Sequence, residues 1–169
     1  KQLYFWDSLT YVGVAFAPAF SLVISLAFVN HYEKLPKLYY FFFFIPLLTN
    51  IMVWTNPLHN LHYVHFSIIA QEVAFGPYIY FSGLYSYICM ISAVLIMMNF
   101  TIKARNSLYI KQALMFALSN IIPTIVSFIA TFKLLDLPIT ATPIAFIVTI
   151  LLHGYSISKL NYLSITPLA

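Results

Sequence analysis

Five long apolar stretches follow one another along the chain, and short polar segments separate them. The stretches are Leu9–Val29, Leu38–Trp54, Tyr78–Phe100, Ala113–Phe132 and Pro138–Ser158, and none contains Asp, Glu, Lys or Arg. Each is close to the ~20 apolar residues with which a helix crosses about 30 Å of hydrocarbon. Strands of a membrane barrel would alternate apolar and polar residues instead. The pattern therefore predicts an all-α integral membrane protein, a bundle of five transmembrane helices in a single domain over residues 1–169.

The composition indicates a surface that faces lipid. Hydrophobic residues make up 62% of the chain and charged residues 7%, whereas soluble domains carry about 25% charged residues. Eight basic and four acidic side chains are too few to keep a globule of this size in water. We expect the lipid bilayer to be its main partner, and we expect no nucleic-acid partner.

Basic residues collect on one side of the predicted membrane. Six of the eight fall in segments that share a side if the chain crosses five times: Lys34, Lys37, Lys103, Arg105, Lys111 and Lys159. Because basic loops stay in the cytoplasm, the N-terminus is expected outside and the C-terminus inside. The loop between the second and third stretches, roughly residues 56–77, is then extracellular.

This loop carries a pattern that is typical of a strand. The segment "HYVHFS", residues 62–67, has the period of two that places alternate side chains on opposite faces. Residues 70–72 could turn the chain back through residues 73–75, so we expect a short extracellular hairpin or cap over the bundle. An interfacial helix is the alternative, because Trp and Tyr favour the headgroup zone.

Prolines interrupt four of the five stretches. Pro18, Pro46 and Pro123 fall near the middle of their stretches, and Pro143 falls early in the last one. A proline inside a helix removes a backbone hydrogen bond and bends the helix, and in membranes neighbouring helices or water satisfy the freed carbonyl. We expect these prolines to shape bundle packing, and the sharper hypothesis is that they open a cavity or act as hinges in signal relay.

Polar and aromatic side chains inside the stretches or just beyond their outer ends form two overlapping groups. The first is expected mostly to hydrogen-bond across helices and consists of Asn50, Ser82, Ser119, Asn120, Thr142, Thr149 and His153. The second falls in the predicted outer half, where it could line an outward-facing ligand pocket with aromatic walls, and consists of Asn50, Trp54, Tyr80, Thr142, His59 and Asp136.

Three of the five histidines, His59, His62 and His65, are spaced three residues apart in the loop. Metal ligands must converge on one point, and this spacing disperses the rings on a helix or a strand, so we expect no metal. His31 and His153 could ligate haem between helix ends, which leaves a haem- or quinone-binding redox subunit as an alternative; otherwise we expect no cofactor.

A fragment of a transporter or channel is the other alternative. A proton-coupled carrier normally has an ionisable residue inside a span, and the five predicted stretches contain no acidic or basic residue. No Gly-rich phosphate loop, nucleophile elbow or HExxH motif is present. We therefore expect no catalytic residue.

The segments "TNPLHNLHY", from Thr55, and "FGPYIYFSGLYSY", from Phe75, resemble the N-terminal seven-helix sensor region of bacterial histidine kinases. In that family Thr-Asn-Pro-Leu-His leaves one span, and Tyr-Gly-Pro with an aromatic-rich stretch begins the next. Further landmarks occur in the family's order: Pro18, Gln112, Pro123, "LDLPITATP" around Asp136 and Pro143, and the final "TPLA". The resemblance covers nearly the whole chain.

The sequence also departs from the family pattern. The family has seven spans and this sequence has five, so we expect that two N-terminal spans are missing, which leaves the orientation unchanged. Tyr80 stands where the family often has Trp, and Phe75 where it often has Tyr. Of the loop histidines only His59 matches the family pattern, and we expect it to contact a ligand beside Asn56.

The resemblance implies a membrane-embedded signal-sensing domain of a sensor histidine kinase, part of a two-component system in the bacterial inner membrane. A ligand would bind in the outer half of the bundle, and the helices would relay a rearrangement to a cytoplasmic kinase that forms a homodimer. Because few charges are available to pair with it, a small apolar or amphipathic ligand fits better than a strongly charged one, with a peptide as the second option. This region itself is expected not to be an enzyme.

Overall fold

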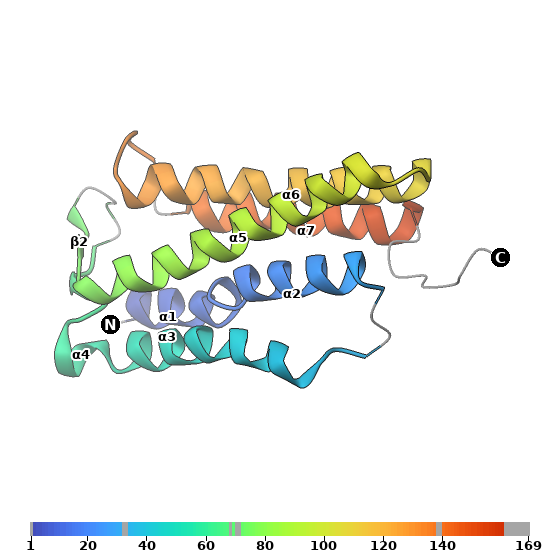
Figure 1. The fold of residues 1–169 in the computed structure, drawn as a ribbon. Coiled ribbons are helices and arrows are strands. Elements are labelled where there is room, and N and C mark those ends of the chain that lie inside the picture. Colours follow the sequence, from blue (N-terminus) through green and yellow to red (C-terminus); the bar gives the residue numbers. More distant parts are fainter. Residues whose placement is uncertain (1, 32–33, 68, 70–71, 138–139, 161–169) are drawn as a thin grey trace.

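The computed structural model is a bundle of helices with a two-stranded sheet at one end (Figure 1). It describes residues 2–31, 34–67, 69, 72–137 and 140–160. In chain order the elements are α1 Gln2–Val14, α2 Ala17–Val29, the 3₁₀ helix η1 Lys37–Phe43, α3 Phe44–Trp54, α4 Asn56–His59, β1 Tyr63–His65, β2 Ala74–Phe75, α5 Pro77–Lys103, α6 Ser107–Thr131 and α7 Ala141–Leu160.

Four helical segments of the described chain are long and apolar enough to cross a membrane. They are α1 with α2 (Gln2–Val29), η1 with α3 (Lys37–Trp54), α5 and α6. α7 carries a shorter apolar stretch, Ala141–Tyr155, and the predicted start of this span, Pro138, lies outside the described residues. The helical class is thus confirmed, while the count of five spans stays a prediction.

The first helix begins earlier than its apolar stretch. The predicted span is Leu9–Val29, but α1 begins at Gln2, and a turn at residues 15–16 separates it from α2. Asp7 therefore lies inside a helical segment that is long enough to span the membrane. The predicted stretch Leu9–Val29 leaves Asp7 out, whereas the helical segment Gln2–Val29 includes it. A hydropathy pattern leaves out a lone carboxylate in front of an apolar stretch whether or not the backbone continues as a helix.

The two longest helices also extend beyond their apolar stretches. α5 continues to Lys103, and α6 begins at Ser107 rather than at the predicted Ala113. Asn106 precedes α6, and its side-chain oxygen accepts a hydrogen bond from the Leu108 N–H at 2.8 Å. Such a cap satisfies one of the backbone donors that a helix start leaves unpaired. Capping therefore sets this helix end, which hydropathy alone does not mark.

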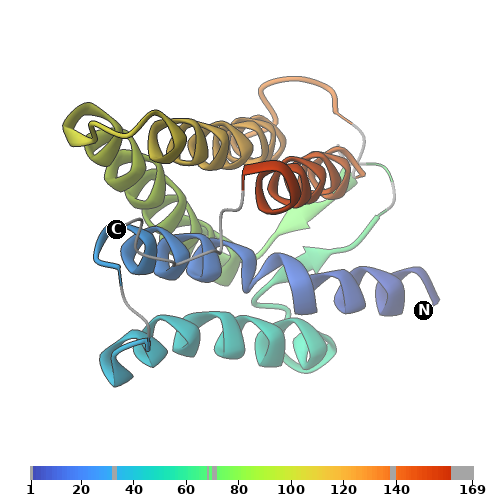
Figure 2. The ribbon, with the colours of Figure 1, turned by 90° about the vertical axis from the view of Figure 1, so that its right-hand side faces the viewer.

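α1 and α2 lie between α3 on one side and α5, α6 and α7 on the other (Figure 2). α5 packs against α2 and α6, and α6 packs against α7. The turn after α2, the turn between α5 and α6, and the end of α7 all lie at the end of the bundle opposite the sheet (Figure 1).

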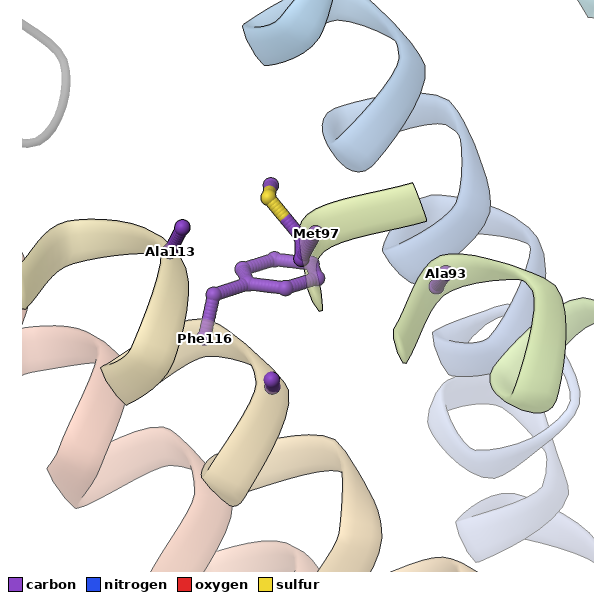
Figure 3. Close-up of a cluster of buried hydrophobic side chains, with 5 residues drawn as sticks. Ala93, Met97, Ala113 and Phe116 are labelled. Atoms are coloured by element: carbon purple, nitrogen blue, oxygen red, sulfur yellow. The ribbon is translucent and has the colours of Figure 1, made fainter. Parts of the chain in front are cut away.

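The main hydrophobic cluster lies between α5 and α6, toward the end opposite the sheet. Ala93 and Met97 of α5 meet Ala113, Phe116 and Ala117 of α6 (Figure 3), and all five are buried. Alanines let two helix backbones approach closely in a membrane, and the ring of Phe116 extends toward Met97 (Figure 3). Partly buried side chains of α2 and α5 cover this cluster: Ile24, Phe28, Val29, Val94 and Phe100.

The hairpin predicted in the loop is present. β1 pairs antiparallel with β2, with Tyr63 opposite Phe75 and His65 opposite Ala74. The sheet lies at the start of α5, and the single-turn helix α4 precedes it (Figure 1). A two-stranded hairpin is only marginally stable alone, so its contacts with the rest of the loop and bundle hold it in place.

Candidate functional site

The candidate site is a cavity of about 270 Å³ in the half of the bundle nearest the sheet. Side chains from α1, α2, α3, α5, α6 and α7 line it, and both strands of the hairpin contribute to its wall. Its apolar lining includes Val14, Ala15, Ile79, Met90 and Phe146. Its polar lining includes Asp7, Thr10, Tyr11, Thr49, Tyr63, Ser82, Tyr85, Ser86, Thr124, Ser127, Lys133, Asp136 and Thr142.

The four prolines predicted as hinges line this cavity: Pro18, Pro46, Pro123 and Pro143. Pro18 follows the turn between α1 and α2, and Pro46 and Pro143 lie in the first turns of α3 and α7. Pro123 lies inside α6. Proline is tolerated in the first turn of a helix and bends a helix interior, so the cavity lies where three helices begin and where α6 contains an internal proline.

Hydroxyl groups of neighbouring helices satisfy two of the carbonyls that these prolines free. Pro46 lacks the N–H that would bond to the carbonyl four residues earlier, and the Tyr85 hydroxyl of α5 donates to that oxygen. Pro123 likewise frees the carbonyl of Ser119, and Thr149 Oγ1 of α7 donates to it at 2.7 Å. The expectation that neighbouring helices satisfy freed carbonyls is confirmed at both positions.

A short chain of polar groups lies on the hairpin side of the cavity. The hydroxyls of Tyr11 and Tyr63 are 3.1 Å apart, and Asp7 lines the cavity together with both tyrosines. Burial raises the pKa of Tyr63 well above its usual value, so this hydroxyl keeps its hydrogen. Tyr63 therefore connects the hairpin to the first helix through the cavity wall.

Asn56, the second residue of the "TNPLH" motif, fixes the position of β1. Its Nδ2 donates to the carbonyl of Tyr63 at 3.0 Å. Its Oδ1 accepts from the N–H groups of His62 at 2.8 Å and Tyr63 at 3.0 Å. The side chain is buried. Asn56 thus holds in place the backbone of a residue that lines the cavity, without lining the cavity itself.

His59, the last residue of the motif, bonds within the same loop. Its Nδ1 accepts from the Leu61 N–H at 3.0 Å, so the ring hydrogen is on Nε2. Nε2 lies 3.1 Å from Thr55 Oγ1, whose own hydrogen is donated to the Ile51 carbonyl. Nε2 is therefore the donor to Thr55, and the ring ties α4 to the end of α3.

Gly76 joins the two halves of the sequence signature. Its N–H donates to the His62 carbonyl at 2.8 Å, and the N–H of Tyr78 donates to the Leu61 carbonyl at 2.9 Å. A Cβ at position 76 would lie 2.1 Å from the Leu61 oxygen, so only glycine allows this approach. Pro77 then begins α5. The segments "TNPLHNLHY" and "FGPY" are therefore one structural unit.

Comparison with known protein families identifies the family to which the chain belongs. A sequence model of the family described as the N-terminal 7TM region of histidine kinase matches residues 1–167. The chain belongs to this family. The resemblance read from the two segments is confirmed, and the chain is a membrane sensor region of histidine kinases in a multi-pass bacterial membrane protein. No curated protein and no solved structure is significantly similar to the chain.

In this 7TM sensor region, two of the seven predicted ligand-binding residues line the cavity, namely Asp136 and Thr142. Asn50 donates from Nδ2 to a carbonyl of its own helix at 3.0 Å. Trp54 and Tyr80 are exposed on α3 and α5. Five of the seven residues thus lie outside the cavity lining: Asn50, Trp54, Tyr80, Asn56 and His59. The ligand contacts predicted for all seven stay predictions.

The cavity residues of the 7TM sensor region that sequence reasoning missed include Asp7, Tyr11 and Tyr63. A usable signal was present, because Asp7, Tyr11, Val14 and Pro18 recur at the spacing of three to four that places side chains on one helix face. The hydropathy pattern does not mark this face, because the apolar stretch begins at Leu9 whereas α1 begins at Gln2. Among the described residues, no group of three or more His, Cys, Asp or Glu side chains is arranged to hold a metal ion.

Proposed function

We propose that this region binds a signal molecule in the cavity and passes a helix rearrangement to a cytoplasmic histidine kinase. The observation that carries the proposal is that one cavity is lined by six helices and by the prolines that interrupt four of the predicted spans. A ligand shifts a conformational equilibrium by its difference in affinity for the two states. Interrupted helices at the cavity and a packed cluster at the other end suit the transfer of such a shift along whole helices.

The charge distribution supports an orientation with the sheet outside. Five basic residues lie at or near the turns opposite the sheet: Lys34, Lys37, Lys103, Arg105 and Lys111. Basic loops are retained in the cytoplasm, so the cavity half faces outward and α7 leads inward. The kinase that follows is proposed to be a homodimer through its cytoplasmic part.

The size of the cavity supports a small ligand. Ligand pockets usually enclose about 300–1,000 Å³, and this cavity of about 270 Å³ is at the lower limit. A small apolar or amphipathic molecule fits, whereas a peptide would insert no more than a side chain. Asp136 and Thr142 are proposed as ligand contacts, and Asn56 and His59 are proposed to act by holding the hairpin that carries Tyr63.

Filling the cavity tests the proposal without knowledge of the ligand. Gly83 of α5 and Ala130 of α6 line the cavity, so Gly83→Leu and Ala130→Leu each add volume from a different helix. Gly13→Leu is the matched control, because Gly13 is exposed and no atom lies within 4 Å of its added Cβ. The measurement is the basal autophosphorylation rate of the full-length protein in lipid nanodiscs.

Both cavity variants are expected to change this rate about fivefold or more, since ~1 kcal/mol between two states changes their ratio by that factor. The control is expected to keep the unmodified rate. Unchanged rates in both folded cavity variants, or an equal change in the control, would contradict the proposal.

A further inference from the structure

The cavity contains an acid that the proposed function does not use. Asp7 lies in the second turn of α1, inside a segment whose other residues are mostly apolar, and it lines the cavity. Its Oδ2 is buried and has no hydrogen-bond partner among the described residues. Burying an ionised carboxylate without a partner is costly. In a membrane helix such a residue is a candidate functional group.

The tyrosines beside Asp7 leave it as a hydrogen-bond acceptor. Tyr11 and Tyr63 line the cavity together with Asp7, and neither hydroxyl donates a hydrogen bond to the buried Asp7 Oδ2. The two tyrosine hydroxyls are 3.1 Å apart, so one of them donates to the other. That hydrogen is used between the tyrosines, and Asp7 Oδ2 can still accept.

Most other hydroxyls of the cavity wall are also left as acceptors. The hydrogens of Thr49, Ser82, Ser86 and Thr124 are donated to backbone carbonyls of their own helices, at 2.7–3.2 Å. The Tyr85 hydroxyl donates to the carbonyl freed by the proline of α3. A hydroxyl that has donated its hydrogen retains only lone pairs. The wall therefore favours a ligand that donates hydrogen bonds.

The charges of the wall point the same way. Two carboxylates, Asp7 and Asp136, and one ammonium group, Lys133, line the cavity. The Lys133 ammonium donates to the Val73 carbonyl at 2.9 Å and lies 5.9 Å from the centre of the Phe75 ring. Lys133 is thus engaged with the hairpin, and the balance of charge in the wall is negative.

We propose that the cavity binds a small amphipathic amine, with its protonated amino group on Asp7 and its apolar body against Ile79, Met90 and Phe146. An ammonium group has three donors and no acceptor, which complements a wall of acceptors. Charge-assisted hydrogen bonds of this kind are the strong ones. The proposal rests on the proposed function only in taking this cavity as the signal site.

The test compares four probes that share a phenyl ring: 2-phenylethylamine, 2-phenylethanol, 3-phenylpropanoate and ethylbenzene. Binding to the full-length protein is measured by titration calorimetry at pH 7.5 in phosphatidylcholine nanodiscs, whose lipid carries no net charge, with empty nanodiscs as the blank. The variants are Asp7→Asn, which keeps the shape of the side chain, and Glu72→Gln. Glu72 is the matched control, because it accepts from Ser67 in the loop and does not line the cavity.

The amine is expected to bind at least about tenfold more tightly than the other probes, because only the amine supplies a charged donor to the buried acceptor. Asp7→Asn is expected to remove that preference while binding of the alcohol changes little, and Glu72→Gln is expected to keep it. Failure of the amine to bind, equal affinity for the anion or for ethylbenzene, or a preference retained in Asp7→Asn would overturn the proposal.

If Asp7→Asn does not fold, the affinities of the four probes for the unmodified protein still test whether the cavity prefers an amine. The cavity-filling variants test a separate claim, that the cavity controls autophosphorylation. If filling the cavity changes autophosphorylation but the amine does not bind, the amine class is wrong and the sensor function stands. If the amine binds but filling has no effect on the rate, the cavity binds amines without controlling the kinase.

Discussion

At the scale of single residues, His62 has the most unusual surroundings in the loop. It is fully buried, and neither ring nitrogen has a hydrogen-bond partner among the described residues. The rings of Tyr11 and Tyr63 meet it edge-on, with centroids 4.9 and 4.7 Å away, and Tyr78 is 6.2 Å away. Burial, with a smaller contribution from His59, lowers the pKa of His62 to about 4.

This pKa predicts a loss of stability in acid. Between pH 6.5, the usual pKa of histidine, and about 4 the unfolded chain binds a proton at this position and the folded chain does not. Stability rises with pH where the unfolded state binds more protons, so the contribution of His62 is complete above about pH 6.5 and is lost as the pH falls toward 4. Over that window the loss is as much as ~3 kcal/mol, at ~1.4 kcal/mol per pH unit.

Thermal unfolding in detergent at pH 7.5 and pH 5 measures this effect. We expect the unmodified protein to lose stability at pH 5, and His62→Phe, which keeps an aromatic ring without titratable nitrogens, to lose clearly less. Equal losses in the two proteins would show that His62 does not titrate in this way.

At the scale of elements, α6 and α7 depend on a hydrogen bond that compensates for a proline. Pro123 cannot donate to the Ser119 carbonyl, and Thr149 Oγ1 donates to it instead. A buried carbonyl that loses its only strong donor costs about 1–3 kcal/mol. The two residues are therefore expected to be coupled in energy although they lie on different helices.

A double-mutant cycle tests this coupling. Thr149→Val, which keeps the shape of the side chain, is expected to destabilise the protein by ~1–2 kcal/mol. In the Pro123→Ala background an alanine N–H can bond to the Ser119 carbonyl, so the same change is expected to cost clearly less. The free energies of unfolding of the four proteins give the coupling, and equal costs in both backgrounds would contradict it.

The elements also show what the sequence can and cannot predict. Hydropathy located every long helix, because lipid requires long apolar segments. The alternating pattern of residues 62–67 located the hairpin, and the motif residues identified the family. The prediction that polar side chains of the spans bond mainly across helices is wrong for several: Asn50, Ser82, Ser119 and Asn120 donate to carbonyls of their own helices. Such side chains reach both kinds of acceptor, and packing decides between them.

The residues of the candidate site were also predicted from the sequence only in part. The four prolines were selected by their positions in the spans, and the structure brings them to one cavity. Asn56 was selected by its motif, but the direction of its side chain, toward the backbone of β1, depends on how the loop folds back. Asp7 was missed because a single acid in front of an apolar stretch looks the same whether the helix includes it or not.

At the scale of the whole molecule, the orientation can be tested by labelling. Leu58 in α4 is 85% exposed near the sheet, and Ser107 is exposed at the opposite end. In a Cys89→Ala background, which removes the buried native thiol, Leu58→Cys is expected to react with a membrane-impermeant maleimide on intact cells. Ser107→Cys is expected to react only after the membrane is opened. The reverse pattern would place the cavity half in the cytoplasm.

The central claim is that the state of the cavity controls the opposite end of the bundle. Spin labels at Ile102 of α5 and Tyr155 of α7 report on that end, where both side chains are exposed. Double electron–electron resonance in nanodiscs gives the distance distribution between the two labels. We predict that Gly83→Leu and Ala130→Leu each change this distribution and that Gly13→Leu does not. Identical distributions in all three variants and in the unmodified protein would contradict the claim.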